Sequence, residues 1–147
     1  MTPARTYRRY APATLAQARA LAADVGLTLR EWGLPERRVV GWELAVAEMA
    51  TNLARHGYSD ETGAEPGPMW LDVTWGPEGL SMVLADEGEP FDPAAVPVPP
   101  APDPGDPDSW PESGMGLPLI RSVVDRLDYR TEGPRNLMTL FVSDPSA

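Results

Sequence analysis

A proline-rich stretch in the second half of the chain limits the possible fold more than any other feature. Nine prolines lie between Pro90 and Pro111, together with several aspartates. Proline lacks the backbone N–H that helices and sheet interiors require, so this stretch must be a loop. The part of the chain after it is too short to bury a core of its own. We therefore expect one fold assembled from both sides of a long loop, which in a compact domain commonly serves as a lid or binding loop.

The strongest helical pattern lies before that loop, in the stretch ELAVAEMATNLARHGY. Apolar residues at helical spacing predict a helix from about Val39 to Arg55, and the expected core residues are Val39, Trp42, Val46, Met49, Ala50 and Leu53. Glu48 and Asn52 fall on the other side, one helical turn apart. Such a pair suits Mg²⁺ held by the amide oxygen, with the carboxylate orienting or deprotonating a hydroxyl. Glu and Asn are also common on solvated helix faces, so this helix alone favours the solvated face over a metal site.

The other elements are short and are separated by glycine and proline. Strands are predicted at 5–10, 69–75, 79–85, 126–131 and 136–142, and helices at 13–32 and from about 35 to 57. Ser59 to Pro68 is expected to be a loop. Gly114-Met115-Gly116 precedes an apolar helical pattern formed by Leu117, Ile120, Val123, Val124 and Leu127. Glycines in front of a helix let backbone amides approach a phosphate at the positive end of the helix dipole.

The charge excludes several classes of function. The formal charge is −10, and the chain contains arginine but no lysine. Binding to nucleic acid needs a basic footprint that this chain lacks. The Walker A loop and the conventional protein kinase both need a lysine at the phosphates, so they are excluded as well. Any phosphate chemistry must rely on Mg²⁺, backbone amides and arginine.

The length, the lack of cysteine and the hydropathy pattern set the broad class of protein. A chain of 147 residues suits one domain with a core of ordinary size. There is no cysteine, which favours a reducing compartment and removes thiolate metal sites. No apolar run approaches the roughly 18 residues of a membrane span, and the first residues have no export signal. We expect a cytoplasmic protein.

Three short motifs carry the functional information, and each of them is weak by itself. Glu48-x-x-x-Asn52 lies on a helix, Asp86-x-Gly88 follows at a strand end, and Gly114-x-Gly116 opens a helix after the long loop. Their order and spacing resemble the N, G1 and G2 boxes of the GHKL, or Bergerat-fold, ATPases, which are histidine kinase-like. Within that group the chain is most similar to the anti-sigma-factor serine kinases, the RsbW-like family.

The resemblance covers nearly the whole chain and rests on specific segments. These are Ala47 to Asn52 followed by His56-Gly57-Tyr58, Asp86-Glu87-Gly88 followed by Pro90 to Pro93, and Ser113 to Leu117. The resemblance implies an α+β fold, a two-layer α/β sandwich whose mostly antiparallel sheet carries helices on one face. It also implies a single domain over residues 1–147, with an ATP lid at about 93–113.

The family implies a role for each matching residue. Glu48 corresponds to the general base, Asn52 to the Mg²⁺ ligand, and Asp86 to the carboxylate that accepts a hydrogen bond from the adenine amino group. Gly88 corresponds to the glycine that lets the backbone approach the base. The expected phosphate-binding segment consists of Ser113, Gly114, Met115, Gly116 and Leu117. An ionised Asp suits the adenine amine because it only accepts hydrogen bonds.

The function implied is that of an ATP-dependent serine/threonine kinase with Mg²⁺ as cofactor. Its substrate would be a STAS-domain anti-sigma factor antagonist, and it would also bind a sigma factor and form a homodimer. Two features of the sequence, Glu112 and the proline-rich lid, leave alternatives open. Glu112 stands where related kinases often carry a basic residue, which favours a non-catalytic module that binds ATP or ADP and a partner protein. A nucleotide-free interaction domain with the proline-rich loop as binding element is the third alternative.

Four further polar residues have no role that the sequence decides. Arg55 and Arg121 could reach a phosphate, or could be ordinary surface arginines. Near the last strand, relatives often carry Gly-Thr or Gly-Asn where this chain has Arg135-Asn136. Whether Asn136 or Thr139 lies near the phosphates is therefore open. His56 is expected to pack at the helix end, because no carboxylate in the sequence is placed to pair with it.

Overall fold

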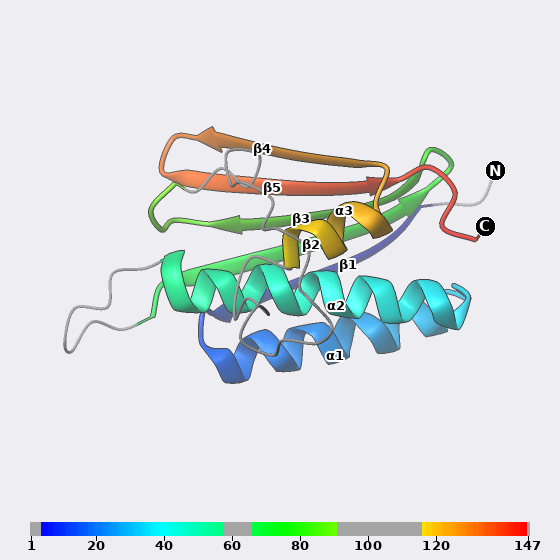
Figure 1. Ribbon diagram of the computed structural model, residues 1–147, viewed down its shortest axis with the longest axis horizontal. Helices are drawn as coiled ribbons and strands as arrows, with labels where there is room; N and C mark the ends of the chain where they lie inside the picture. Colours follow the sequence, from blue (N-terminus) through cyan, green and yellow to red (C-terminus); the bar gives the residue numbers. More distant parts are fainter. Residues whose placement is uncertain (1–3, 58–65, 91–115, 147) are drawn as a thin grey trace, which may run out of the picture.

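The chain folds into two layers, a five-stranded sheet and a layer of helices. The computed structural model describes residues 4–57, 66–90 and 116–146. The elements in chain order are β1 Arg5–Pro12, α1 Leu15–Glu31, α2 Glu36–Asn52, η1 Leu53–Gly57, β2 Pro68–Gly76, β3 Gly79–Asp86, α3 Gly116–Val123, β4 Arg126–Glu132 and β5 Arg135–Val142. Figure 1 shows α1, α2 and α3 together on one side of the sheet. This α+β arrangement confirms the predicted fold class.

The sheet is antiparallel throughout and has the order β1-β2-β3-β5-β4. Residues of one parity face the helices because side chains alternate along a strand. The buried strand residues on this face include Met69, Leu71, Val73, Leu80, Met82, Leu84, Leu140 and Val142. β3 and β5 are neighbours in the sheet although α3 and β4 lie between them in the sequence. Residues that face each other on β3 and β5 are therefore distant in the sequence.

α1 and α2 form an antiparallel pair over the sheet, and their ends carry identifiable stops. The Thr14 hydroxyl accepts a hydrogen bond from the backbone N–H of Gln17, which caps the start of α1. Gly33 follows α1 with φ of 91°, a left-handed conformation that favours glycine at a helix C-terminus.

Between α1 and the sheet, the Tyr7 hydroxyl donates a hydrogen bond to Asp24 at 2.8 Å. Burial and this hydrogen bond raise the pKa of Tyr7.

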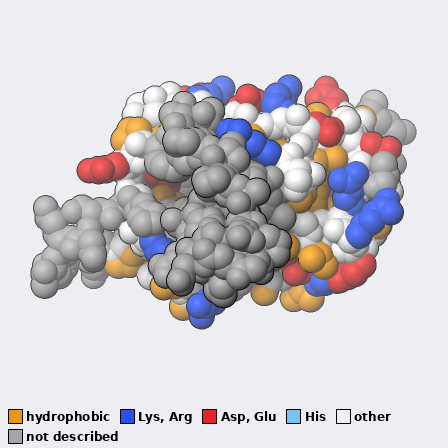
Figure 2. Space-filling view, viewed as in Figure 1, with side chains coloured by type: hydrophobic (Ala, Val, Ile, Leu, Met, Phe, Trp, Pro, Cys, Tyr) orange, Lys and Arg blue, Asp and Glu red, His pale blue; other side chains and the backbone are white. Residues whose placement is uncertain are grey.

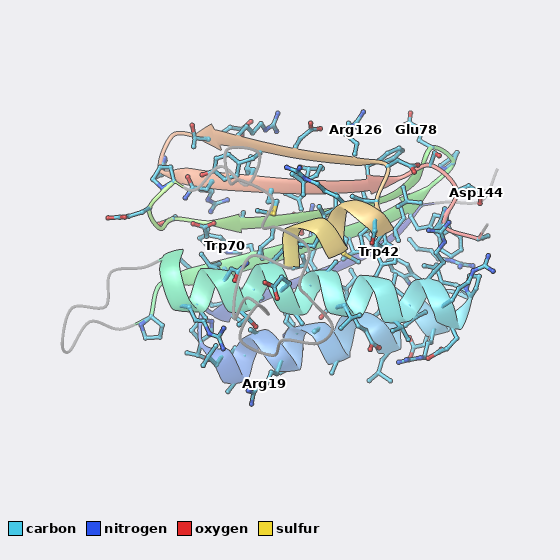
Figure 3. The ribbon with its side chains drawn as sticks, in the orientation of Figure 1. Arg19, Trp42, Trp70, Glu78, Arg126 and Asp144 are labelled. Atoms are coloured by element: carbon cyan, nitrogen blue, oxygen red, sulfur yellow. The ribbon has the colours of Figure 1, made fainter. Side chains whose placement is uncertain are left out.

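The predicted elements are confirmed with small shifts. All six core residues expected on α2 are buried, and Trp42 lies between that helix and the sheet (Figure 3). α1 buries Ala18, Ala22, Val25 and Leu29 as expected, but Leu15 is 42% exposed because it begins the helix and lies at the end of the packed stretch. α3 ends at Val123, so Leu127 belongs to β4 instead of the helix. The expected ATP lid at 93–113, and most of the loop expected at Ser59 to Pro68, lie outside the described residues.

The face of the sheet away from the helices carries aromatic rings and paired charges. The rings of Tyr10 and Trp70 lie 5.8 Å apart, and the Arg135 guanidinium lies 4.2 Å from the centroid of the Trp70 ring. Arg126 lies over Phe141 in the same way. Where Figure 2 shows the described surface uncovered, basic and acidic side chains are interspersed. None of the described helices is long and apolar enough to cross a membrane.

Candidate functional site

The candidate site is built where α2, β3 and β5 meet at one end of the molecule, on the left in Figure 1. Glu48 and Asn52 are both half-buried near the end of α2. They share a stripe of the helix with Gly41, and a Cβ at Gly41 would lie 3.2 Å from a methyl group of Val123 in α3. The predicted pair therefore lies on the side of α2 that faces α3, and its two polar groups face the same region.

Asp86 is the last residue of β3 and lies on the helix-facing side of the sheet, in one row with Met69 and Asn136. Its Oδ1 accepts two hydrogen bonds of 2.8 Å each, from the backbone N–H of Gly88 and from the Asn136 amide. Within the described residues, both bonds go to this one oxygen and none to Oδ2. With respect to the described residues, a carboxylate held in this way keeps its other oxygen as an acceptor for a ligand that donates an N–H.

Gly88 is held against the end of the helix that carries Asn52. After α2 the chain makes a π-helical turn, Leu53–Gly57. The Gly57 carbonyl accepts a hydrogen bond from the Glu89 N–H at 2.7 Å, and a Cβ added at Gly88 would overlap the same carbonyl group. The sequence predicted a glycine here because it lets the backbone approach a base. The close contact with the Gly57 carbonyl also requires a residue without a side chain at this position.

Replacing Gly88 by Ala is expected to lower the free energy of unfolding by about 2–3 kcal/mol, because backbone atoms must move to accept the new methyl group. The control is Gly76→Ala, where the nearest side-chain atom would be an ordinary 3.7 Å away. That change is expected to stay within about 0.5 kcal/mol of the wild type. Urea unfolding of the three proteins measures both effects, and equal stabilities for the two variants would contradict the contact at Gly57.

The predicted phosphate-binding segment is described only at its end. Ser113, Gly114 and Met115 lie outside the described residues, whereas Gly116 opens α3 and Leu117 follows it in the helix. The side chains of the first four residues of α3 are likewise outside the description. In Figure 1, α3 runs opposite to α2, so that its first residue points toward the end of α2 that carries Asn52. The structure therefore places the predicted phosphate-binding segment only through the position of α3.

Two residues at the start of β5 belong to the site although the sequence left their role open. Asn136 is bonded to Asp86 and, at 2.9 Å, to the Gly88 carbonyl. Its neighbour Arg135 lies on the other face of the sheet, where its Nε is 3.9 Å from a carboxylate oxygen of Glu87. Thr139 shares the face of Arg135, since it is three residues from Asn136 along the strand, and so it points away from Asp86. The order of the strands, which no local pattern encodes, would have been needed to find this arrangement.

The structure does not assign a role to the remaining polar candidates. Arg55 and Arg121 are exposed, which fits both the surface alternative and contact with a bound phosphate. The side chain of His56 lies outside the described residues. No group of three or more His, Cys, Asp or Glu residues that could hold a metal ion occurs in the described part of the chain. The donors present fit a Mg²⁺ ion that takes one amide oxygen from Asn52 and completes its shell with phosphate oxygens and water.

A protein-family model decides which family this arrangement belongs to. The model of the histidine kinase-like ATPase domain matches residues 11–141, and the match includes Glu48, Asn52, Asp86, Gly88 and the start of α3. The chain belongs to this family. This match confirms the resemblance to histidine kinase-like ATPases that was predicted from the order of the motifs.

Solved structures show the same fold for this histidine kinase-like ATPase domain. The crystal structure of the RsbU and RsbW domains of Rv1364c from Mycobacterium tuberculosis matches it with a TM-score of 0.65 at 18% identity. The match covers 96% of this chain and 32% of that chain, so this chain spans about a third of the length of the chain in that structure. A search among curated proteins found no significant match.

Proposed function

We propose that this histidine kinase-like ATPase domain is an ATP-dependent serine/threonine kinase that binds adenine at Asp86. The observation that carries the proposal is the state of that carboxylate. Two protein donors hold its Oδ1, while no described residue donates to its Oδ2. The exocyclic amine of adenine donates hydrogen bonds and fits this acceptor, whereas guanine presents a carbonyl oxygen at the equivalent position.

The catalytic part of the proposal rests on Glu48 and Asn52. Asn52 would hold Mg²⁺, which supplies charge stabilisation for the phosphates when it is bound. Glu48 lies one turn away on the same stripe of α2 and is half-buried. It would orient or deprotonate a Ser or Thr hydroxyl of the substrate. Ser113 to Leu117 would offer backbone amides and the start of α3 to the phosphates.

The proposed partners are proteins of the cytoplasm. The substrate would be a STAS-domain anti-sigma factor antagonist, and phosphorylation of that antagonist would leave the domain free to bind a sigma factor. The similar solved structure contains an RsbW domain, which supports this choice of partners. A second copy of the chain would form a homodimer. We propose that the second copy binds at the sheet face with Tyr10, Trp70 and Phe141. The arginines on this face pair with neighbouring acids or rings, so their charge does not repel a second copy.

Two measurements test the proposal in sequence. Calorimetric titration of Mg-ATP and Mg-ADP into the wild type is expected to give micromolar dissociation constants. No heat at about 0.1 mM protein, where a Kd tighter than about 1 mM would register, would remove the nucleotide site. Mass spectrometry of STAS domains from the same genome, incubated with the chain and Mg-ATP, then detects phosphoryl transfer.

The outcome of the transfer assay separates the two nucleotide-binding alternatives. Transfer to a Ser or Thr of one STAS domain supports the kinase. Nucleotide binding without transfer to any STAS domain favours the non-catalytic module whose partner binding depends on ATP or ADP. Sedimentation of the same preparation reports the oligomer, and a mass of one chain at all concentrations would remove the homodimer.

A further inference from the structure

Asn136 is the single buried side chain in the described part of the protein that is polar or charged. It is 4% exposed and lies at the start of β5, where it is paired with Asp86 of the neighbouring strand β3. A polar group in such a position must have hydrogen-bond partners, because burial without them is costly. Its partners are Asp86 Oδ1 at 2.8 Å and the Gly88 carbonyl at 2.9 Å. Within the described part of the chain, the bonds of this amide are thus directed at the turn formed by Asp86, Glu87 and Gly88, called the Asp86 turn below.

The chemistry of the two partners fixes which way the Asn136 amide points. A carboxylate oxygen and a backbone carbonyl oxygen both accept hydrogen bonds and donate none. Only the NH₂ group of the amide can satisfy both, so both of its N–H groups are used. This leaves Asn136 no N–H for a ligand. Asn136 acts on Asp86 and on the backbone of Gly88.

The consequence lies in the orientation of the Asp86 carboxylate. The terminal torsion of an Asp side chain is broad, so a carboxylate without fixed partners rotates easily. Here two donors, the Gly88 N–H and the Asn136 amide, hold the same oxygen at 2.8 Å. We infer that Asn136 is a positioning residue that fixes Asp86 with Oδ2 toward the base, and thereby sets the preference of the site for a purine with a 6-amino group. This inference rests on the proposed function.

The other side of the same turn is held by the preceding residue of β5. Arg135 stacks on the ring of Trp70 and approaches Glu87, which lies between Asp86 and Gly88. Consecutive residues of the strand therefore hold the turn from opposite faces of the sheet. The Asp86 turn is fixed as a unit, and Asn136 is the part of this support that contacts the carboxylate itself.

The test is a cycle that combines a change in the protein with a change in the ligand. Binding of ATP and of purine riboside triphosphate, which is ATP without its 6-amino group, is measured by calorimetry for the wild type and for Asn136→Leu. The wild type is expected to bind ATP about tenfold more tightly, which corresponds to one hydrogen bond to a charged group. In Asn136→Leu, ATP binding is expected to weaken about tenfold, while purine riboside triphosphate changes less than about threefold.

The ratio of the two affinities separates positioning from a merely structural role. A general loss of structure would weaken both ligands equally and keep the ratio, and that result overturns the inference. Unchanged binding of both ligands by Asn136→Leu overturns it too. So does equal binding of the two ligands by the wild type, which would also remove adenine recognition at Asp86 from the proposed function, although ATP binding and the kinase activity would then stand. If the wild type binds neither ligand, the proposed function fails at the first step, and the inference fails with it.

Two further variants keep the test decisive if Asn136→Leu does not fold. Asn136→Thr keeps one donor and suits a strand, so it is expected to give a ratio between those of the wild type and Asn136→Leu. Thr139→Val changes a half-buried residue of the same strand on the opposite face, and its ratio is expected to equal that of the wild type. Because threonine has one donor where Asn136 has two, a wild-type ratio in folded Asn136→Thr would show that the amide is not what sets the preference, and it would overturn the inference.

Discussion

Replacing Asp86 by Asn is expected to leave the chain folded and to weaken adenine-nucleotide binding at least about a hundredfold. In the variant, the amide oxygen can take the place of Oδ1 and accept from Gly88 and Asn136, so the turn keeps its bonds. The NH₂ group then occupies the place of Oδ2, where it faces the amine of adenine, donor against donor. Losing a charge-assisted bond and leaving a donor unpaired costs about 3 kcal/mol, which is a factor of about a hundred.

Calorimetric titration of Mg-ATP and Mg-ADP into both proteins measures this effect. Thermal unfolding without nucleotide serves as the control, and the two melting temperatures are expected to lie within a few degrees of each other. Undiminished binding by a folded Asp86→Asn would show that adenine is not read at this carboxylate. A variant that no longer folds would show instead that the negative charge is needed by the protein itself.

The second large effect is expected at Glu48. Changing Glu48 to Gln keeps the shape and polarity of the side chain but removes its ability to accept a proton. A positioned general base typically contributes a factor of about 10²–10⁴, so phosphoryl transfer to the proposed STAS substrate is expected to fall by this amount. Mg-ATP binding is expected to change little, because the proposed metal ligand Asn52 and the proposed adenine site are untouched. Single-turnover transfer and calorimetry measure the two quantities separately.

A matched control lies on the same helix. Glu43 also belongs to α2, but its carboxylate lies 2.9 Å from Arg30 and packs over Gly26 of α1, away from the α3 side. Glu43→Gln is expected to transfer phosphate at the wild-type rate. Equal transfer by Glu48→Gln and the wild type would remove Glu48 from the chemistry. Equal losses in the Glu48 and Glu43 variants would indicate a general effect of negative charge on the helix.

Local patterns predicted the elements of this fold because local physics produces them. The apolar stripe of α2 is a matter of helical period, and the hairpin of β2 and β3 follows from two β-prone runs around Gly76-Pro77-Glu78. The exposed Leu15 shows the limit of periodicity. A pattern reports which side of a helix is apolar, and it does not report how far along its axis the neighbouring layer extends.

The missing half of the site depends on contacts between distant parts of the chain. Asp86 and Asn136 are 50 residues apart, and they meet because β5 inserts between β3 and β4. The contact of Gly57 with Gly88 and Glu89 likewise joins a helix end to a strand end. The motif Asp86-x-Gly88 identified both residues as candidates and contains the N–H of Gly88 that holds Asp86, but it contains neither Asn136 nor Gly57.

The junction at Gly57 also bears on how such a domain can change during evolution. Its carbonyl accepts a hydrogen bond from the Glu89 N–H and leaves no room for a Cβ at Gly88. A side chain at residue 88 would therefore require the chain end that follows α2 to move as well. Substitutions at these two places are expected to occur together, whereas substitutions of exposed residues away from such contacts usually cost little.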